Sequence, residues 1–364
     1  MDIYTGDIIA MYSSPSYDPN LFLFGISQDD WQLIRNNPQK PLINKTLSGL
    51  YSPGSTIKPI VALSALENNI IDKNFTIKCT GKTELYGQTF HCWKEKGHGF
   101  VSLKNAMKQS CDTYFYEVSR LLGVDRLSVT AKKFGLGEKV LGEYFSNEKQ
   151  GLFPNTSWKK NNLGKGWVLG ESLITGIGQG YTQTTPLQLC LMTAQIANGG
   201  YKVKPKIIVN NNTLSLADAK KSIELQSLQT QNRRLFNNQR NIKIVQEAMF
   251  SSTNEQYGTS YSSRIDNPKY QFAGKTGTAQ VKRISMRERE LDLKLEQIPY
   301  KDRDHALYIA YGPYKSPRYA VSIIVEHGGS GSKAAAPIAK KLFKLIIDRH
   351  EQRNNQSNFK EINI

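Results

Sequence analysis

The stretch that decides the fold begins at residue 52 and reads Ser52-Pro53-Gly54-Ser55-Thr56-Ile57-Lys58. Pro53 and Gly54 break the chain, and the residues from Ser55 to Asn68 carry apolar side chains at helical spacing. We therefore predict that Ser55 opens a helix, with its hydroxyl at the positive end of the helix dipole. Lys58 follows one turn later on the same face. The pattern thus places a hydroxyl beside an amine at a helix N-terminus.

The rest of the chain places strands near its two ends and helices between them. Residues 1–12 are predicted to form a hairpin about a Thr-Gly-Asp turn, and residues 270–281, 306–312 and 319–327 to form strands. Helices are predicted at residues 102–122, 125–134, 186–198, 242–250 and 334–349. Residues 79–99 are expected to form a Gly-rich loop and residues 210–238 a polar surface excursion.

This order predicts an α+β protein with a sheet built from both chain ends. The domain spans residues 1–349, a helical insertion occupies about 60–260, and residues 350–364 form a polar, disordered tail.

Composition excludes several classes of protein. The 364 residues are 22% charged and 10% aromatic, which argues against wholesale disorder, and four cysteines are too few for a disulfide scaffold. No apolar run approaches the roughly 18 residues of a membrane span, and no signal peptide is visible. The net charge of +17 is spread along the chain without a nucleic-acid-binding motif. We therefore expect no nucleic acid partner, and a basic surface suited to an anionic wall polymer or a membrane face.

Two further motifs accompany Ser55 and Lys58. Ser-x-x-Lys by itself carries little information, because it also occurs at Ser146, Ser157, Ser330 and Ser357. Lys-Thr-Gly, in contrast, occurs once, within the predicted strand, as Lys275-Thr276-Gly277-Thr278. Glycine weakens a strand unless something approaches its backbone closely. A substrate could therefore lie along this edge, with the lysine and threonine side chains meeting a carboxylate. Between the two motifs lies Ser110-Cys111-Asp112.

These three elements, in this order, are the signature of the penicillin-recognising serine enzymes. The chain resembles the transpeptidase domain of class B penicillin-binding proteins over nearly all its length. Supporting stretches are Thr5 to Met11, Ser14 to Asn20, Gly176 to Gly180 and Thr185 to Gln188. Phe90 to Trp93, Gly97 to Gly99 and the aspartate at position 112 most resemble the elongation-specific group, penicillin-binding protein 2.

The resemblance implies a serine β-lactamase/DD-transpeptidase-like fold with a central antiparallel sheet, and an acyl-transfer enzyme. Ser55 would attack the carbonyl between two terminal D-alanines of a peptidoglycan stem peptide, and Lys58 would take its proton. Ser110 would relay protons to the leaving group. Lys275 and Thr276 would hold the substrate carboxylate, and the N–H groups of Ser55 and Thr278 would form the oxyanion hole. An amine from a neighbouring stem peptide would complete the cross-link, and β-lactams would acylate the same serine.

Asp112 departs from most related enzymes, which carry asparagine there. An ionised aspartate cannot donate to a substrate amide, and it favours a charged Lys58. We expect Lys275 to act as the nearby cation that lowers the pKa of Lys58. Alternatives to the transpeptidase are a serine β-lactamase, a non-catalytic penicillin-sensing domain, and a scaffold that binds anionic polymer.

Three of the four cysteines fall close together along the chain. Cys79, Cys92 and Cys111, with His98, form a Cys₃His set that suits closed tetrahedral zinc. His91 is an alternative to His98. A Cys79–Cys92 disulfide and free thiols are the other possibilities. Zinc would be structural, holding the loop against the helix of the catalytic serine, and catalysis needs no cofactor.

The resemblance also implies a place in the cell. It implies the periplasmic face of the bacterial inner membrane, with an N-terminal anchor absent from this chain. The implied partner is a membrane-embedded glycan polymerase.

Overall fold

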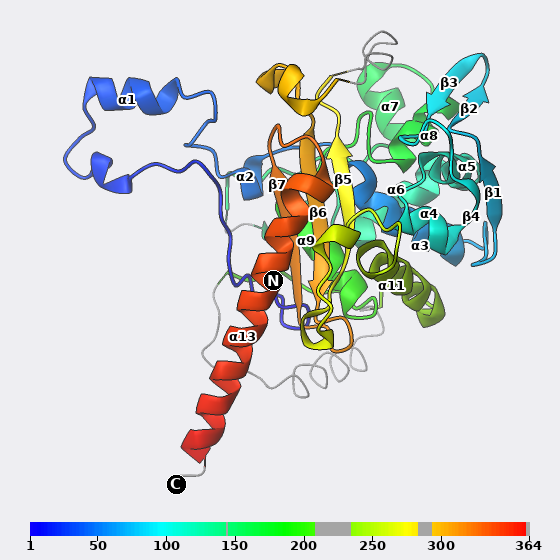
Figure 1. The fold of residues 1–364 in the computed structure, drawn as a ribbon. Helices are drawn as coiled ribbons and strands as arrows, with labels where there is room; N and C mark the ends of the chain where they lie inside the picture. Colours follow the sequence, from blue (N-terminus) through cyan, green and yellow to red (C-terminus); the bar gives the residue numbers. More distant parts are fainter. Residues whose placement is uncertain (143–144, 208–233, 283–292, 362–364) are drawn as a thin grey trace.

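The central sheet of the computed structural model is a three-stranded antiparallel unit, β5 (Ala273–Ala279), β6 (His305–Gly312) and β7 (Tyr319–Val325), in that spatial order. The structure describes residues 1–142, 145–207, 234–282 and 293–361. All three strands fall within the three predicted segments to within a few residues. The α+β fold predicted from the sequence is therefore confirmed, and β5 forms the edge of the sheet that faces the helical region (Figure 1).

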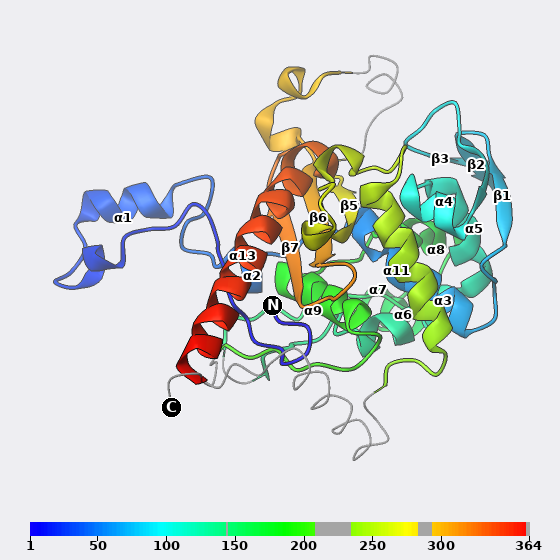
Figure 2. The ribbon, with the colours of Figure 1, turned by 60° about the horizontal axis from the view of Figure 1, so that its bottom comes forward.

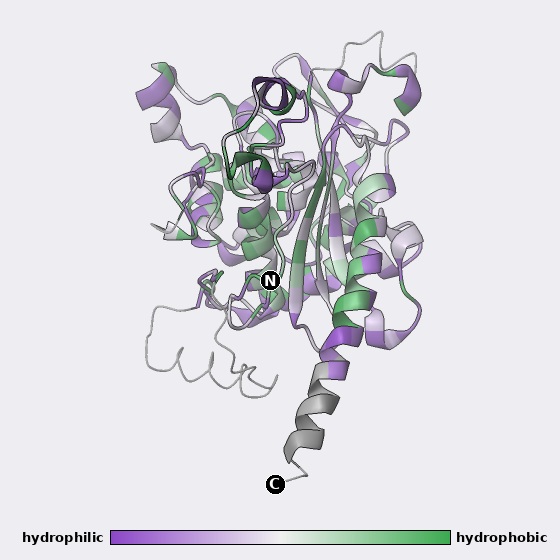
Figure 3. Cartoon of the chain, turned by 90° about the vertical axis from the view of Figure 1, so that its left-hand side faces the viewer, coloured by the Kyte–Doolittle hydropathy of each residue, from purple (hydrophilic) through white to green (hydrophobic). Residues whose placement is uncertain are grey.

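The sheet separates two hydrophobic cores, because successive side chains of a strand point to opposite faces. Leu307, Ile309 and Tyr311 of β6 belong to the core shared with the helical region, which includes α9 (Pro186–Ala197). The alternate residues of β6, Ala306, Tyr308 and Ala310, pack with α13 (Ala336–Glu361). Figure 2 shows α13 lying along one side of the sheet. In Figure 3 hydrophobic positions of α13 lie where the helix accompanies the strands.

The N-terminus joins this sheet, as predicted, but not through a hairpin. Met1 and Ala320 exchange two backbone hydrogen bonds of 2.9 Å, and the amide of Ile3 donates to the carbonyl of Arg318. Residues 1–12 contain only isolated bridges, at Asp2 and Asp7. Asp2 itself is engaged by the following turn, since its carboxylate accepts from the amides of Tyr4 and Thr5. This turn replaces the predicted hairpin.

Helices form the other half of the molecule. The predicted first helix is a 3₁₀ turn, η2 (Gly54–Ile57), that continues into α3 (Lys58–Glu67). The remaining helices of this part are α2 (Lys45–Ser48), α4 (Leu103–Lys108), α5 (Asp112–Leu122), α6 (Val124–Lys133), α7 (Thr156–Leu163), α8 (Leu169–Gly176) and α11 (Gln239–Asn254). The prediction of one helix over residues 102–122 is wrong, because the chain breaks between α4 and α5. The predicted excursion at 210–238 lies largely outside the described residues.

The expected Gly-rich loop at residues 79–99 contains regular structure. Strand β1 (Thr76–Cys79) pairs with β4 (Gly99–Ser102), and β2 (Lys82–Leu85) pairs with β3 (Gln88–His91). These short ribbons pass beside α5, which gives the segment a fixed path over the helical region (Figure 1).

Two segments extend from the body. The chain around α1 (Gln28–Arg35) projects as an arm (Figure 1). Helix α13 continues to Glu361, into the segment expected to be a disordered tail. None of the helices in the described part of the chain combines the length and hydrophobicity that crossing a bilayer requires.

The contact between α13 and the sheet gives a stability prediction. Phe343 is 1% exposed and stacks on Phe272 with ring centroids 5.0 Å apart. We expect Phe343→Ala to lower the free energy of unfolding by about 3–5 kcal/mol, because it leaves a cavity in this core. Urea denaturation measures the change. Leu345→Ala, an exposed position on the same helix, is the control and should change stability by less than about 0.5 kcal/mol. Equal effects of the two variants would show that α13 does not cover the sheet as described.

Candidate active site

The turn at Gly54 sets Ser55 directly against the edge strand β5. Gly54 has a φ of +53°, and a Cβ placed there would lie 2.4 Å from the carbonyl oxygen of Thr278. Only glycine permits both that backbone conformation and that approach. Ser55 is partly exposed at the end of this turn, and Lys58 is fully buried. The Ser-x-x-Lys motif at 55 therefore spans the boundary between solvent and core.

Ser110 lies at the break between α4 and α5. The amide of Ser110 donates to the carbonyl of Met107, and the amide of Cys111 donates to that of Ala106. These two bonds form the Schellman pattern that ends many helices, usually with glycine in the left-handed position. Serine occupies that position here, with a φ of +55°. The break turns the Ser110 hydroxyl toward the buried lysines.

Two lysine amines meet at that hydroxyl. Lys275 Nζ lies 2.8 Å from Ser110 Oγ, and Lys58 Nζ lies 3.2 Å from the same atom. Lys58 Nζ also donates to the Ser110 carbonyl at 2.9 Å and to Asp112 Oδ1 at 2.7 Å. Burial, together with the charge of Lys58, lowers the pKa of Lys275 well below its usual range, and Asp112 opposes the shift. Four residues from three segments far apart in sequence thus share one buried polar cluster.

Asp112 uses both carboxylate oxygens. Oδ1 receives the Lys58 ammonium, and Oδ2 accepts from the backbone amide of Trp93 at 3.0 Å. The Trp93 indole donates to the carbonyl of Gln109, which fixes this contact from a second side. Asp112 therefore orients Lys58 and ties the 79–99 segment to the start of α5, where an acidic residue is also favoured by the helix dipole.

Strand β5 turns its free edge toward Ser55. In an antiparallel strand the N–H and C=O of one residue point to the same side. The carbonyl of Thr278 accepts from Gln179 Nε2 at 3.0 Å and contacts the Gly54 turn, so its N–H also points away from β6 and toward the cleft. The segment that requires glycine at position 277 is the turn that carries Ser55. A Cβ there would lie 2.7 Å from the Thr56 methyl and 3.0 Å from the Pro53 carbonyl.

A cleft of 1550 Å³ joins these parts. Of the predicted catalytic and substrate-binding residues, it is lined by Ser55, Ser110, Asp112, Thr276, Gly277 and Thr278, while Lys58 and Lys275 lie buried beneath it; the predicted metal ligand Cys92 also lines it. The sequence analysis did not single out Gln179 or Thr259, whose hydroxyl accepts from Thr276 at 2.8 Å. Gln179 belongs to the quoted Gly176 to Gly180 stretch, so a signal for it was present. Thr259 belongs to none of the motifs.

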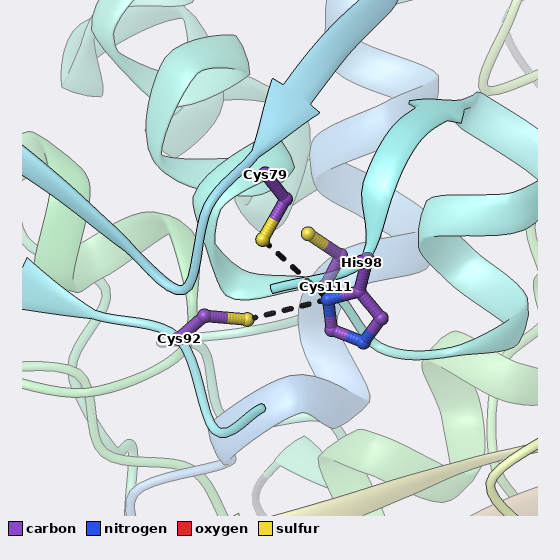
Figure 4. A group of neighbouring side chains, drawn as sticks. All are labelled: Cys79, Cys92, His98 and Cys111. Carbon is purple, nitrogen blue, oxygen red and sulfur yellow. Dashed lines mark hydrogen bonds between the residues drawn. The ribbon is translucent and has the colours of Figure 1, made fainter. Parts of the chain in front are cut away.

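The predicted Cys₃His set gathers in space. The ligand atoms of Cys79, Cys92, His98 and Cys111 all lie within 4.8 Å of one another (Figure 4). His98 Nδ1 lies 3.5 Å from the Cys79 sulfur and 3.6 Å from the Cys92 sulfur. All four cysteines are free, so the Cys79–Cys92 disulfide does not form, and His91 lies outside the group.

The cluster also changes the acidity of its members. A hydrogen bond from Cys111 lowers the pKa of Cys92 to about 2, and the same contact raises the pKa of Cys111. Burial opposes deprotonation of Cys79, yet hydrogen bonds with Thr113 and His98 lower its pKa overall. The site thus favours thiolate at Cys79 and Cys92, which is the form that binds metal.

The fold and the serine–lysine cleft define a class of protein that the comparisons bear out. Residues 1–344 match the penicillin binding protein transpeptidase domain, and the chain belongs to that family. The family and the fold expected from the resemblance are therefore confirmed.

Among its relatives, the peptidoglycan D,D-transpeptidase MrdA of Acinetobacter baumannii is 36% identical over 93% of this chain and 49% of that protein. MrdA of Escherichia coli K12 is 34% identical over 95% of this chain and 53% of its own length. The chain thus spans about half the length of the curated relatives it matches.

Solved structures are similar throughout. Pseudomonas aeruginosa PBP2 in complex with WCK 5153 superposes with a TM-score of 0.79 at 35% identity, covering 95% of this chain and 72% of the other. Helicobacter pylori PBP2 in complex with MreC gives 0.80 at 34% identity, covering 95% and 59%. In both cases the similarity covers 95% of this chain.

The contact between Gly54 and Thr278 gives a prediction for reactivity. Gly54→Ala should reduce acylation by a fluorescent penicillin about 100-fold, because the added methyl displaces Ser55 from the edge of β5. Stopped-time labelling on gels measures the rate. Gly164→Ala is the matched control, since Gly164 also has a positive φ but meets nothing within 4 Å. Unchanged labelling in Gly54→Ala would mean that this approach does not position the serine.

Proposed function

We propose that this chain is a peptidoglycan DD-transpeptidase domain that cross-links stem peptides during cell-wall elongation through an acyl-enzyme on Ser55. The observation that carries the proposal is the convergence of Ser55, Lys58 and Ser110 on the free edge of a strand that bears Lys275-Thr276-Gly277-Thr278. Family membership and the similarity to peptidoglycan D,D-transpeptidases support the same reaction class. No cofactor takes part in the chemistry.

Acylation begins with proton transfer from Ser55 to the neutral amine of Lys58 as the serine oxygen bonds to the donor carbonyl carbon. Three acceptors surround Lys58 Nζ at rest, matching the three protons of an ammonium. One proton must therefore leave first, and Ser110 Oγ, shared with Lys275, is the direct route.

The acyl-enzyme forms when the carbon–nitrogen bond breaks and the departing D-alanine amine takes a proton from Lys58 through Ser110. The amides of Ser55 and Thr278 stabilise the negative charge that develops on the carbonyl oxygen. Thr276, and Lys275 in its charged form, hold the terminal carboxylate of the donor. A second stem peptide then attacks the acyl carbon with its amine, and Ser55 recovers its proton.

Removing the nucleophile tests this proposal. Ser55→Ala should abolish covalent labelling by a fluorescent penicillin, because it removes the oxygen that would form the acyl-enzyme while leaving Ser110 in the cleft. Intact-mass spectrometry reads the adduct, its stoichiometry and its lifetime. Ser146→Ala, in a second Ser-x-x-Lys sequence that is exposed, is the control and should label normally.

Labelling that survives in Ser55→Ala would remove the assignment. An adduct in the unaltered chain that is lost within seconds, with turnover of nitrocefin, would indicate a β-lactamase instead.

We also propose that Cys79, Cys92, His98 and Cys111 hold a structural zinc ion. Tetrahedral zinc with Zn–S of about 2.3 Å and Zn–N of about 2.0 Å requires sulfur–nitrogen separations of about 3.5 Å. Separations of 3.5 and 3.6 Å are found here. The ion would bind Cys92 next to Trp93, and Cys111 between Ser110 and Asp112. It would thereby fix the contact between Trp93 and Asp112 that orients Lys58.

Elemental analysis should find about one zinc per chain. A strong chelator should lower the melting temperature, because the free energy of zinc binding contributes to the stability of the folded state. Cys92→Ser should lose the metal. Cys190→Ser, which alters the cysteine outside the cluster, should retain it. Metal-free protein with an unchanged melting temperature would end the zinc proposal without touching the acyl-transfer proposal.

The relatives also support a proposal for the cellular setting. We propose that the chain works at the periplasmic face of the inner membrane, held by an N-terminal anchor, with a membrane-embedded glycan polymerase as partner. In support, one solved relative is a Helicobacter pylori PBP2 bound to MreC, and another comes from a peptidoglycan synthase complex.

A further inference from the structure

Besides Asp112, one other carboxylate lines the cleft among the described residues. Asp304 lies immediately before β6 and borders the same cavity as Ser55 and Thr278. Asp112 is paired with Lys58, whereas Asp304 forms no ion pair within the part of the chain that the structure describes. A carboxylate without a cation, half-buried in a protein of net charge +17, requires an explanation.

The position of Asp304 relative to the reacting groups is fixed by the strand register. His305 pairs with Ala279, so Asp304 lies opposite Gln280, two residues beyond Thr278. At about 3.4 Å per residue that is about 7 Å along the strand from Thr278, and Asp304 belongs to the neighbouring strand segment, about 4.8 Å further across the sheet, so the two positions are about 8 Å apart. This distance suits a substrate group one residue away from the carbonyl that Ser55 attacks.

The backbone holds Asp304 while leaving part of it available. Oδ1 accepts from the amide of Val281 at 3.1 Å, and the Asp304 carbonyl accepts from Gly329. Oδ2 has no hydrogen-bond partner among the described residues. Burial raises the pKa of Asp304, which means that its charge is poorly solvated. The nearby amine of Lys282 lies 3.3 Å from Asp302, so it is drawn to another carboxylate.

From this geometry we propose that Asp304 binds a side-chain ammonium of a stem peptide during the reaction. This rests on the proposed transpeptidase function, which already requires an amine-bearing stem peptide as acceptor. Stem peptides of one wall share one composition, so the donor carries the same amine before it is cross-linked. An ammonium at Oδ2 would restore the solvation that the carboxylate lost on burial. The source of the amine, donor or acceptor, is decided by experiment.

The donor test compares two thioesters that release a thiol on acylation. One carries a free side-chain amine on the residue before the D-alanyl group, and in the other that amine is acetylated. We expect the unaltered chain to prefer the amine-bearing donor in kcat/KM about tenfold, as for a hydrogen bond between charged groups. High salt should reduce this preference. Asp304→Asn, whose amide oxygen can still accept from Val281, should abolish it, while Asp29→Asn, at an exposed position of α1, should retain it.

The acceptor test uses the acetylated donor and varies the concentration of an acceptor peptide. A rise of about tenfold in the KM for the acceptor in Asp304→Asn, with no change in the donor test, would assign the subsite to the acceptor amine. The proposal would be overturned if the unaltered chain used the two thioesters equally and Asp304→Asn left the KM for the acceptor unchanged.

Failure of the proposal is distinct from failure of the proposed function. If the chain is not an acyl-transfer enzyme, neither thioester reacts and penicillin labelling is absent. If only the subsite is wrong, both thioesters react equally and penicillin labels both Asp304→Asn and the unaltered chain.

Discussion

The whole site depends on the side-chain amines of two lysines being held at one hydroxyl inside the protein. Lys58 comes from α3, Lys275 from β5 and Ser110 from the break before α5. The Nζ atoms of the two lysines lie 3.2 Å and 2.8 Å from Ser110 Oγ. Neither amine would be stable alone in such a place, because burying an unpaired charge costs several kcal/mol. Asp112 offsets one charge, and the lowered pKa of Lys275 removes part of the other. The same arrangement that makes burial tolerable leaves a proton that can move.

The strained backbone at Ser110 follows from this requirement. A non-glycine residue in the left-handed region costs about 1–2 kcal/mol, and the Schellman pattern there would be served by glycine without strain. Glycine has no hydroxyl to place between the two amines. The molecule therefore retains serine at a position where helix geometry favours glycine, and strain of this kind is typical of functional sites. Cys111 and Asp112 follow Ser110 directly. One turn therefore places the strained serine, one cysteine of the Cys₃His group and the carboxylate that pairs with Lys58.

The sequence predicted those parts whose signals are local. Strands β5, β6 and β7 carry β-rich runs, and Ser55 follows a Pro-Gly break, so both were found close to their true bounds. The break at Ser110 was missed because no glycine or proline marks it. The ribbons β1 to β4 were missed because each is only four residues long, with two residues exposed and at most one buried, which is too short a pattern to indicate a strand. Gly277 was expected to admit a close neighbour, but that neighbour proved to be Thr56 of the serine turn, a contact across more than 200 residues that no local pattern encodes.

The Cys₃His group and the catalytic cleft are best understood as one mechanical unit. Cys92 precedes Trp93, whose amide holds Asp112, and Cys111 stands between Ser110 and Asp112. A displacement of Cys111 would therefore reach the Lys58 amine through one peptide unit and one hydrogen bond, and a displacement of Cys92 through one peptide unit and two hydrogen bonds. A short path of this kind transmits position with little loss, because each link is a covalent bond or a contact of 3.0 Å or less. In this way the Cys₃His group fixes where Lys58, the proposed base, lies relative to Ser55.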